Sequence, residues 1–386
     1  MHIQDAQSTD SVGAMIISRT PFRVSFFGGG TDYPAWYREH GGQVLGTAIN
    51  KYCYITCRYL PPFFEHKYRV VYSRIEDCRS IDEIVHPAAR EVLRYLDIEQ
   101  GIEIHHDGDL PARSGIGSSS SFTVGLLNAA YALKGRMVAK GALAKEAIYI
   151  EQDRLRETVG SQDQVFAAYG GLNHIAFLPN DEVVVTPVTL KAEYSREFAS
   201  HFMLFFTGIK RTASNVAQKY VGSFAEKERS MKTISSMVDE ATTVLRNEHD
   251  LGGFGKLMHE GWRLKRGLDS AVSNSEIDEL YSEAVQAGAL GGKLIGAGGG
   301  GFIVLFVRPR DHGRVRERLA RLIHVPVKFD HSGSRIIFFD PEEDFSEDAR
   351  RRDLVPVEAF REAANIVDAS VHAEDSEDRK CGKEPS

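Results

Sequence analysis

The chain has 386 residues, a formal net charge of −7 and 42% hydrophobic residues, enough for one large or two ordinary folded domains. The acidic balance argues against a nucleic-acid surface, and no apolar run approaches the length of about 18 residues that a membrane span needs. The four cysteines, Cys53, Cys57, Cys78 and Cys381, lack zinc-site spacing, and the polar N-terminus is unlike a signal peptide. We therefore expect a reduced, cytoplasmic protein without a membrane partner.

A polar stretch over residues 1–14 predicts a flexible leader, and an apolar strand follows from Met15 to Phe27. Gly28-Gly29-Gly30-Thr31-Asp32 comes next, and a triple glycine after a strand indicates a sharp turn or a close backbone approach. The Asp32 carboxylate would either stabilise that turn or accept hydrogen bonds from sugar hydroxyls.

A second glycine turn lies in Leu110–Ser121, which reads LPARSGIGSSSS and precedes a long apolar run that predicts a buried helix. Gly115 and Gly117 permit positive φ, and the helix start presents unpaired N–H groups at the positive end of its dipole. These features predict a phosphate site, to which serine hydroxyls could add oxygen ligands for Mg²⁺. The alternative is a plain serine N-cap, since neither a P-loop ending nor G-x-G-x-x-G is present.

The remaining periodicity predicts alternating strands and helices, followed by a charged tail. We expect strands at Val44–Arg58, Tyr68–Ser73, Gly101–His106, Val183–Val188, His201–Thr207, Val325–Asp330 and Arg335–Phe339, and helices at Ile81–Leu96, Lys140–Thr158, within 226–290 and at Val355–Ser370. The adjacent His105 and His106 would point to opposite faces of their strand, which disfavours a metal site.

Asp163 follows Gly160 at or near a helix start. It would either stabilise the helix dipole or act as a carboxylate base that orients a hydroxyl. Further on, Lys210 and Arg211 form a basic turn that is either surface charge or the partner of a substrate phosphate, with Arg113 and Lys51 as further candidates.

The last glycine cluster, Gly296-Ala-Gly-Gly-Gly-Gly301, runs directly into an apolar strand. Each glycine loses more backbone entropy on folding than other residues, so this cluster destabilises the folded chain locally. We therefore expect it to serve a purpose such as the close approach of another segment.

Three motifs in this order, the Gly-Gly-Gly-Thr-Asp turn, the Pro-x-x-x-Gly-Ile-Gly-Ser-Ser-Ser turn and the Gly-Ala-Gly-Gly-Gly-Gly strand, resemble those of the GHMP kinases over roughly residues 15–340. More closely, the segments from Arg19 to Tyr33 and from Gly160 to Asn173 look like those of the D-glycero-D-manno-heptose 7-phosphate kinases. The family's second motif usually reads Gly-Leu-Gly-Ser-Ser-Ala, so Ile116 and the extra serines depart from it and leave open which serine faces the metal.

The resemblance implies an α+β fold with an N-terminal domain resembling ribosomal protein S5 domain 2 over residues 15–190 and a ferredoxin-like C-terminal domain over 191–345, before a charged tail at 346–386. It implies an ATP- and Mg²⁺-dependent kinase for the anomeric hydroxyl of the heptose phosphate, serving surface polysaccharide synthesis. A homo-oligomer is compatible with it. The two late glycine motifs would fold together around the phosphates of ATP.

The resemblance also assigns roles to residues. Asp163 would take the proton of the attacking hydroxyl, with Arg23 beside the transferring phosphoryl group. The nucleotide phosphates would contact Pro111, Arg113, Ser114, Gly115, Ile116, Gly117, Ser118, Ser119, Ser120 and Ser121. Mg²⁺ would bind Glu151 with Ser119 or Ser120. The acceptor would contact Gly29, Gly30, Thr31, Asp32, Gly298, Gly299 and Gly300, and its 7-phosphate would contact Lys210 and Arg211.

Two other functions remain open at this point. One is another sugar-1-kinase of the same superfamily, fucokinase- or galactokinase-like, acting on an unphosphorylated sugar. The other is a non-catalytic regulator that binds nucleotide or sugar, which the joint presence of Asp163, Glu151 and Arg23 disfavours. A mevalonate-branch decarboxylase is disfavoured because nothing beyond the shared motifs indicates an isoprenoid substrate.

Overall fold

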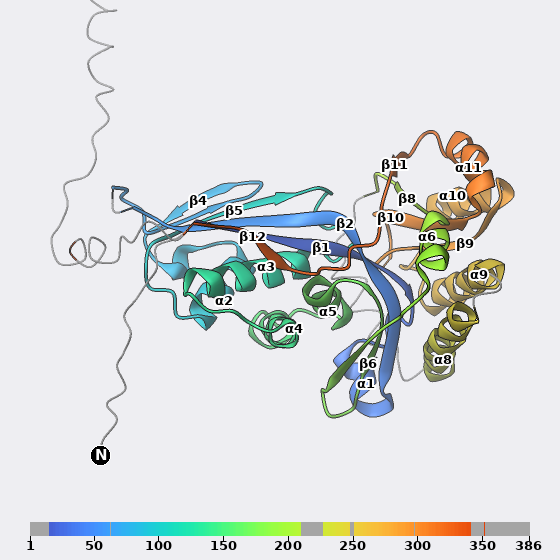
Figure 1. Ribbon diagram of the computed structural model, residues 1–386, viewed down its shortest axis with the longest axis horizontal. Helices are drawn as coiled ribbons and strands as arrows, with labels where there is room; N and C mark the ends of the chain where they lie inside the picture. The colour runs from blue at the N-terminus through green and yellow to red at the C-terminus, as the bar shows by residue number, and fades with distance from the viewer. Residues whose placement is uncertain are drawn as a thin grey trace, which may run out of the picture.

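The structure is a computed structural model that describes residues 15–61, 63–209, 227–247, 251–296, 298–340 and 351. Within these ranges the strands form two sheets, and helices pack against both (Figure 1). None of the helices in these ranges has the length and apolar character that crossing a bilayer requires.

The larger sheet is built on two long antiparallel neighbours, β1 (Met15–Phe27) and β2 (Gly42–Tyr59). Its order is β12-β1-β2-β5-β3-β4, and β6 and β7 extend from the first half of β2. The other strands are β3 (Tyr68–Val71), β4 (Ile75–Cys78), β5 (Ile102–Gly108), β6 (Leu172–Phe177), β7 (Val183–Pro187) and β12 (Arg335–Asp340). In β2, Cys53, Ile55 and Cys57 are buried while the side chains between them are partly exposed, which is the period of a sheet covered on one face.

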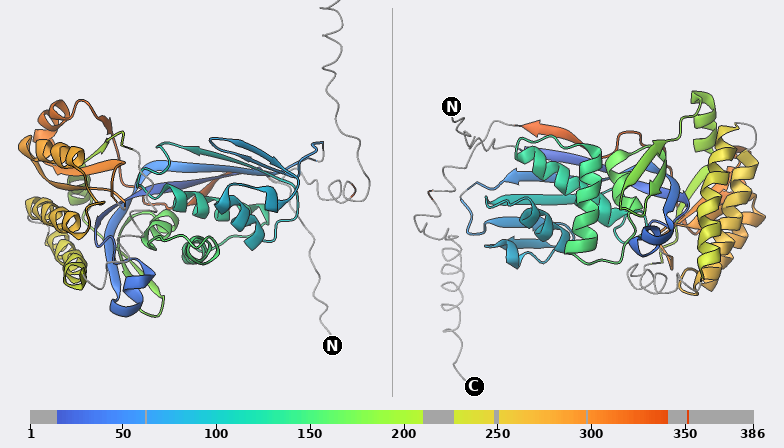
Figure 2. Two further views of the ribbon diagram at one scale, coloured as in Figure 1. Left: turned by 180° about the vertical axis from the view of Figure 1, so that it is seen from behind. Right: turned by 90° about the horizontal axis from the view of Figure 1, so that it is seen from below.

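Helices cover one face of this sheet (Figure 2). They are α2 (Pro87–Tyr95), α3 (Ser118–Leu133), α4 (Lys140–Tyr149) and α5 (Gln162–Tyr169), while α1 (Pro34–His40) lies near β6, where Tyr37 stacks on Phe177. Helix α3 packs on β1 and β2 and is buried almost all round, because its sequence is apolar on every face after the serines. The buried helix predicted after Ser121 is thereby confirmed.

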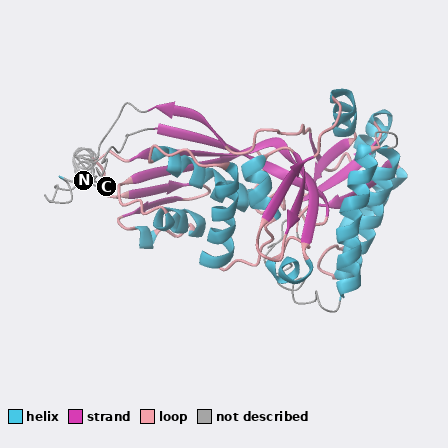
Figure 3. Cartoon of the chain, turned by 60° about the horizontal axis from the view of Figure 1, so that its bottom comes forward, coloured by secondary structure: helices cyan, strands magenta, loops and turns pink. Residues whose placement is uncertain are grey.

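The smaller sheet has the order β11-β8-β10-β9, all antiparallel, with helices on its outer side (Figure 3). Its elements are α6 (Ala192–Ser200), β8 (Phe202–Phe206), α8 (Glu228–Arg246), α9 (Leu251–Leu268), α10 (Ser275–Gln286), β9 (Ala289–Leu294), β10 (Phe302–Val307), α11 (His312–Arg318) and β11 (Ile323–Val325). Helices α8 to α10 connect β8 to β9 and α11 connects β10 to β11, and the strands lie in the order fourth, first, third, second, so the expected ferredoxin-like arrangement is confirmed.

An aromatic cluster joins the two sheets. Phe26 of β1 stacks on Phe202 of β8 with 4.6 Å between ring centroids, and Phe254 of α9 meets both rings edge-on. Because Phe26 lies two residues before the first glycine turn, this packing brings that turn to the junction of the sheets.

Four predicted elements differ from the structure. The helix predicted for Lys140–Thr158 is regular only to Tyr149 and continues as a π-turn at Ile150–Arg154. The region from Ile81 to Leu96 divides into a 3₁₀ turn at Ile81–Glu83 and helix α2, because Pro87 favours the first turn of a helix over its interior. The strand predicted for Val325–Asp330 lies at Ile323–Val325, since Pro326 has no N–H to continue the ladder. Finally, β12 falls within the predicted C-terminal domain but pairs with β1 of the larger sheet.

Candidate active site

The second and third glycine clusters lie in direct contact. A Cβ added to Gly115 would stand 2.5 Å from the Ile295 carbonyl oxygen, and one added to Gly296 would stand 2.7 Å from the Gly115 Cα. Gly301 approaches Ser114 in the same way, with 2.2 Å from a built Cβ to the carbonyl oxygen. Side chains cannot fit at such distances, which explains why these positions are glycine. The expected proximity of the two motifs is confirmed.

The N-terminus of helix α3 adjoins this contact and has no side-chain cap. Gly117 is its N-cap, with φ of 76°, and offers no side-chain cap to the first turn. The first backbone bond of the helix runs from the Ser121 N–H to the Gly117 carbonyl, so the N–H groups of the three preceding serines come before the helical ladder. Together with the helix dipole, these N–H groups form an anion site of the kind that binds phosphate.

The serines of the motif face different directions. Ser118 accepts a hydrogen bond from the Arg113 N–H at 3.2 Å, and Ser119 is exposed. Ser120 is buried and donates to Glu151 Oε2 at 2.9 Å, whereas the Ser121 hydroxyl turns into the core and donates to the Pro21 carbonyl. The Ser121 hydroxyl therefore does not face the predicted phosphate site, contrary to the prediction. The Ile116 side chain is fully buried in the core, so a contact of this residue with phosphate would come from its backbone.

Glu151 is the buried carboxylate of this site and lies in the π-turn after α4. Its Oε2 accepts from Ser120 and from Gln164 Nε2, at 2.9 and 2.6 Å, while Oε1 has no partner among the described residues. Burial raises the pKa of Glu151 to about 7. Single turns of π-helix, such as the one at Ile150–Arg154, often mark functional sites.

This donor set fits magnesium. A buried carboxylate oxygen without a partner and a neighbouring serine hydroxyl are hard oxygen donors, and Mg²⁺ commonly uses one or two carboxylates with substrate phosphates. The described residues contain no cluster of three or more His, Cys, Asp or Glu side chains suited to a metal. His105 instead bonds Glu103 at 2.8 Å, which agrees with the structural role expected for it.

Arg23 and Asp163 form the central ion pair. Arg23 Nε donates to Asp163 Oδ1 and Nη2 donates to Oδ2, each at 2.7 Å, and Nη1 donates to the Gly115 carbonyl at 2.5 Å. Asp163 occupies the first turn of α5, and Gly117 lies beside it, with 3.3 Å from a built Cβ to Oδ2. The predicted base and the predicted basic residue thus meet at the phosphate turn.

Asp32 is buried next to this pair. Its Oδ1 accepts from the Gly30 N–H at 2.8 Å and its Oδ2 from the Gln162 N–H at 3.3 Å. Burial raises the pKa of Asp32, and the charge of Asp163 acts in the same direction. Gly160 leaves room for the carboxylate, since a Cβ there would stand 2.0 Å from Oδ2.

Some predicted acceptor residues have other contacts. Thr31 donates to the Gly28 carbonyl and accepts from the Gln43 N–H, so its hydroxyl serves the turn. The Gly299 N–H donates to the Val272 carbonyl. Gly298 and Gly300 lie against the backbones of Val272 and Ile209 and do not reach the Gly115 turn in the way that Gly296 and Gly301 do. Lys210 and Arg211 lie outside the described residues, as do the leader and the tail helix.

Two lysines that our sequence analysis did not select also reach the site. Lys265 of α9 donates to the Gly296 carbonyl at 2.7 Å, and Lys293 of β9 is buried and donates to the Phe26 carbonyl at 3.3 Å. The sequence contained one signal, because Lys293 lies three positions before the third glycine cluster, in Gly-Gly-Lys-Leu-Ile-Gly.

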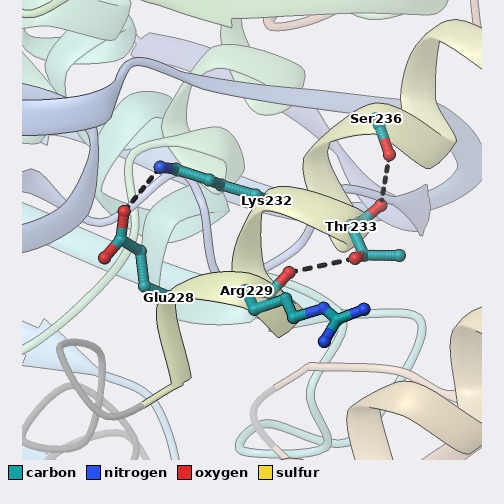
Figure 4. Close-up of a pocket in the computed structure, with 5 residues that line it drawn as sticks. All are labelled: Glu228, Arg229, Lys232, Thr233 and Ser236. Atoms are coloured by element: carbon teal, nitrogen blue, oxygen red, sulfur yellow. Dashed lines mark hydrogen bonds and ion pairs between the residues drawn. The ribbon is translucent and has the colours of Figure 1, made fainter.

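One surface depression lies elsewhere, on the exposed face of α8 (Figure 4). It measures about 570 Å³, and its polar groups bond to one another along the helix: Lys232 to Glu228, Thr233 to the Arg229 carbonyl and Ser236 to the Thr233 carbonyl. Such bonds between neighbouring turns describe a solvated helix face, so we place the chemistry at the glycine turns instead.

The sequence matches the family model of the GHMP kinases N-terminal domain over residues 83–171 and that of the GHMP kinases C-terminal domain over residues 241–324. It is 28% identical over 305 residues to a D-glycero-alpha-D-manno-heptose 7-phosphate kinase of Campylobacter jejuni, which covers 76% of this chain and 90% of that relative. A mevalonate kinase of Methanothermobacter thermautotrophicus is 32% identical over 57% of this chain and 73% of its own length. The solved structure of a D-glycero-D-manno-heptose 1-phosphate kinase from Bacteroides thetaiotaomicron superposes with a TM-score of 0.69 at 25% identity, over 84% of this chain and 99% of that one.

Proposed function

The chain belongs to the GHMP kinases, and on that premise we propose that it phosphorylates the anomeric hydroxyl of D-glycero-D-manno-heptose 7-phosphate. The γ-phosphoryl group of ATP would pass to that hydroxyl, giving the 1,7-bisphosphate and ADP, which would serve the synthesis of activated heptose for surface polysaccharides. Family membership makes the chain a phosphotransferase of the sugar kinase type, and the particular sugar is our proposal.

The observation that carries the proposal is the carboxylate of Asp163, held by Arg23 beside the open start of α3. Both carboxylate oxygens bind the guanidinium, yet each oxygen keeps a second lone pair, and the Asp163 side chain is 24% exposed. A hydroxyl that approaches from the exposed side can therefore give its proton to Asp163. Gly117, the N-cap of α3, lies directly beside Asp163, so the carboxylate adjoins the start of the helix that would bind the phosphates.

Phosphoryl transfer of this kind depends mainly on positioning and on stabilisation of charge. In the proposed mechanism the Gly115–Gly117 turn and the first N–H groups of α3 bind the nucleotide phosphates. Asp163 accepts the proton of the anomeric hydroxyl, which is more acidic than an ordinary alcohol, and Arg23 keeps the carboxylate aligned. Magnesium bound by Glu151 and a neighbouring serine hydroxyl, Ser120 or the exposed Ser119, would neutralise charge on the phosphoryl oxygens.

The choice of sugar is supported by the relative from Campylobacter jejuni, which is named as a heptose 7-phosphate kinase. A structural neighbour from Bacteroides thetaiotaomicron is likewise named as a D-glycero-D-manno-heptose kinase, for the 1-phosphate.

The test is an ADP-release assay with ATP, Mg²⁺ and a panel of acceptors: heptose 7-phosphate, free heptose, fucose and galactose. We expect turnover with heptose 7-phosphate, a kcat/KM at least about tenfold higher than for any free sugar, and a product phosphorylated at C1 by NMR. Turnover of a free sugar alone would contradict the proposal in favour of another sugar-1-kinase. ATP binding without ADP release from any acceptor would indicate a regulator.

A further inference from the structure

Lys265 and Lys293 come from different elements and face one small cavity. The cavity measures about 20 Å³ and is lined by both lysines, by Gly28 and Gly29 of the first glycine turn, and by Met237 of α8. Neither lysine forms an ion pair with a carboxylate within the part of the chain that the structure describes, and each Nζ donates to a backbone carbonyl. The protein thus buries two lysine side chains side by side with no carboxylate in direct contact with either.

This arrangement costs stability when the pocket holds no anion. Burial lowers the pKa of Lys265 to about 8 and also lowers the pKa of Lys293, and the positive charge of Arg23 acts on both in the same direction. The charge of Asp32 raises the pKa of both lysines and that of Asp163 raises the pKa of Lys265, but these carboxylates are already bonded to the Gly30 and Gln162 N–H groups and to Arg23. Uncompensated buried cations are rare unless a ligand completes them.

Unpartnered polar groups surround the same glycine turn. A Cβ on Gly29 would lie 3.5 Å from Ser25 Oγ and 3.6 Å from Gln162 Nε2. Ser25 Oγ and Gln162 Oε1 are buried and have no hydrogen-bond partner among the described residues. Buried polar atoms are nearly always satisfied, so two unpartnered atoms at the glycine turn whose Gly29 also lines the lysine cavity point to a polar ligand.

We propose that Lys265 and Lys293 bind the phosphate ester that the acceptor sugar already carries. The inference deepens the proposed function and rests on it, and it moves the assignment of that phosphate away from Lys210 and Arg211. Two lysines from separate elements supply charge without the planar fork of arginine, which suits a phosphate at the end of a flexible sugar chain. The cavity has room for about one water molecule, so the phosphate enters as Met237, an unbranched and adaptable side chain, changes rotamer.

The kinetic test replaces each lysine by methionine, which keeps the apolar stem and removes the charge. We expect Lys265→Met and Lys293→Met to raise KM for heptose 7-phosphate by about tenfold or more and to raise KM for ATP by much less. Lys256→Met, at an exposed position of the same helix, is the control and should match the wild type. A rise in KM for ATP without a rise for the sugar phosphate would overturn the proposal, because the lysines would then contact nucleotide.

A binding test separates this proposal from the choice of substrate. With the nucleotide site saturated by a non-hydrolysable ATP analogue and Mg²⁺, inorganic phosphate should bind the wild type and Lys256→Met by calorimetry, and binding should be lost in Lys265→Met and Lys293→Met. Phosphate binding by this pattern without turnover of heptose 7-phosphate would refute the substrate and keep the anion site. Turnover of heptose 7-phosphate with an unchanged KM for it in both variants would refute the anion site and keep the proposed substrate. Folding is checked by circular dichroism, since apolar replacement of buried charges is usually tolerated.

Discussion

Arg23 of β1 and Asp163 of α5, 140 positions apart in the chain, meet in a two-point ion pair with both N–O distances at 2.7 Å. The Arg23 side chain is 5% exposed and that of Asp163 is 24% exposed. The guanidinium is therefore buried beneath the carboxylate, and the carboxylate is the member of the pair that solvent reaches. Arg23 also binds the Gly115 carbonyl, which fixes the phosphate turn relative to the carboxylate. One arginine therefore aligns the predicted base with the turn that would hold the reacting phosphate.

The substitution Asp163→Asn tests the base. The amide keeps the shape of the side chain but cannot take a proton, so we expect kcat to fall by about two to four decades. The unfolding midpoint should also fall, because asparagine offers the buried Arg23 guanidinium one accepting oxygen in place of two and no counter-charge, so kcat is compared at a temperature at which both proteins are folded. Arg38 and Asp181 form a comparable pair on the surface, with both side chains more than half exposed. The control Asp181→Asn should leave kcat unchanged, and a wild-type kcat in Asp163→Asn would remove this residue from the mechanism.

Glu151→Gln separates a metal ligand from a structural residue. Glutamine can still accept from Ser120, and its neutral amide avoids the burial cost that raises the pKa of Glu151. We expect the thermal midpoint to stay equal or rise, while the Mg²⁺ concentration for half-maximal activity increases by about tenfold or more. Glu146→Gln, on the preceding helix and bonded to the Tyr131 hydroxyl, is the matched control. Loss of stability without a change in Mg²⁺ dependence would show that Glu151 is only structural.

The contact between the glycine clusters can be tested by a pair of alanine substitutions at positive φ. Gly115 has φ of +85° and would place a Cβ 2.5 Å from the Ile295 carbonyl, whereas Gly135 has φ of +64° with nothing within 4 Å. Gly135→Ala should cost about 1 kcal/mol of unfolding free energy and keep full activity. Gly115→Ala should add a steric cost and raise KM for ATP by about tenfold or more, because the turn must move. Urea unfolding and ATP kinetics measure both, and equal behaviour of the two variants would contradict the close contact.

His86 makes the stability of the larger sheet's helical layer depend on pH. Its ring stacks on Phe122 at 4.4 Å, its Nδ1 accepts from the Ala89 N–H at the start of α2, and burial lowers its pKa from 6.5 to about 4. The charge of Glu76 raises the pKa of His86, and that of His106 lowers it. A histidine with a lowered folded pKa binds its proton less readily than the unfolded chain, so stability is complete above pH 6.5 and falls as pH drops toward 4.

The expected loss from His86 is at most about 3 kcal/mol. His86→Asn keeps an N-cap acceptor for α2 but does not titrate. We therefore expect the urea midpoint of the wild type to fall more between pH 7 and pH 4.5 than that of His86→Asn. Parallel loss in both proteins would assign the pH dependence to other groups.

Much of the fold follows from local sequence pattern. The β-branched and aromatic run around Cys53 and Cys57 predicted β2, and the apolar run after the serines predicted α3. Both patterns are local, because strand-forming side chains and a helix that is apolar on every face leave few ways to bury the chain. Misplaced boundaries, as at Ile323–Val325 and at the π-turn of Ile150–Arg154, arise where proline or tertiary packing overrides local preference. β12 could not be assigned to its sheet, since pairing with β1 is a contact across more than 300 positions.

The sequence alone determined that three glycine motifs, an acid at position 163 and an arginine at position 23 belong together, because each motif is a local signature and their order resembles one family. Only the tertiary structure decided which serine meets Glu151, that Ile116 and Ser121 turn into the core, and that Lys265 and Lys293 converge beside Gly29. Those relationships depend on side-chain direction and on the crossing of a helix with a strand from distant parts of the chain. Neither is encoded in spacing along the sequence.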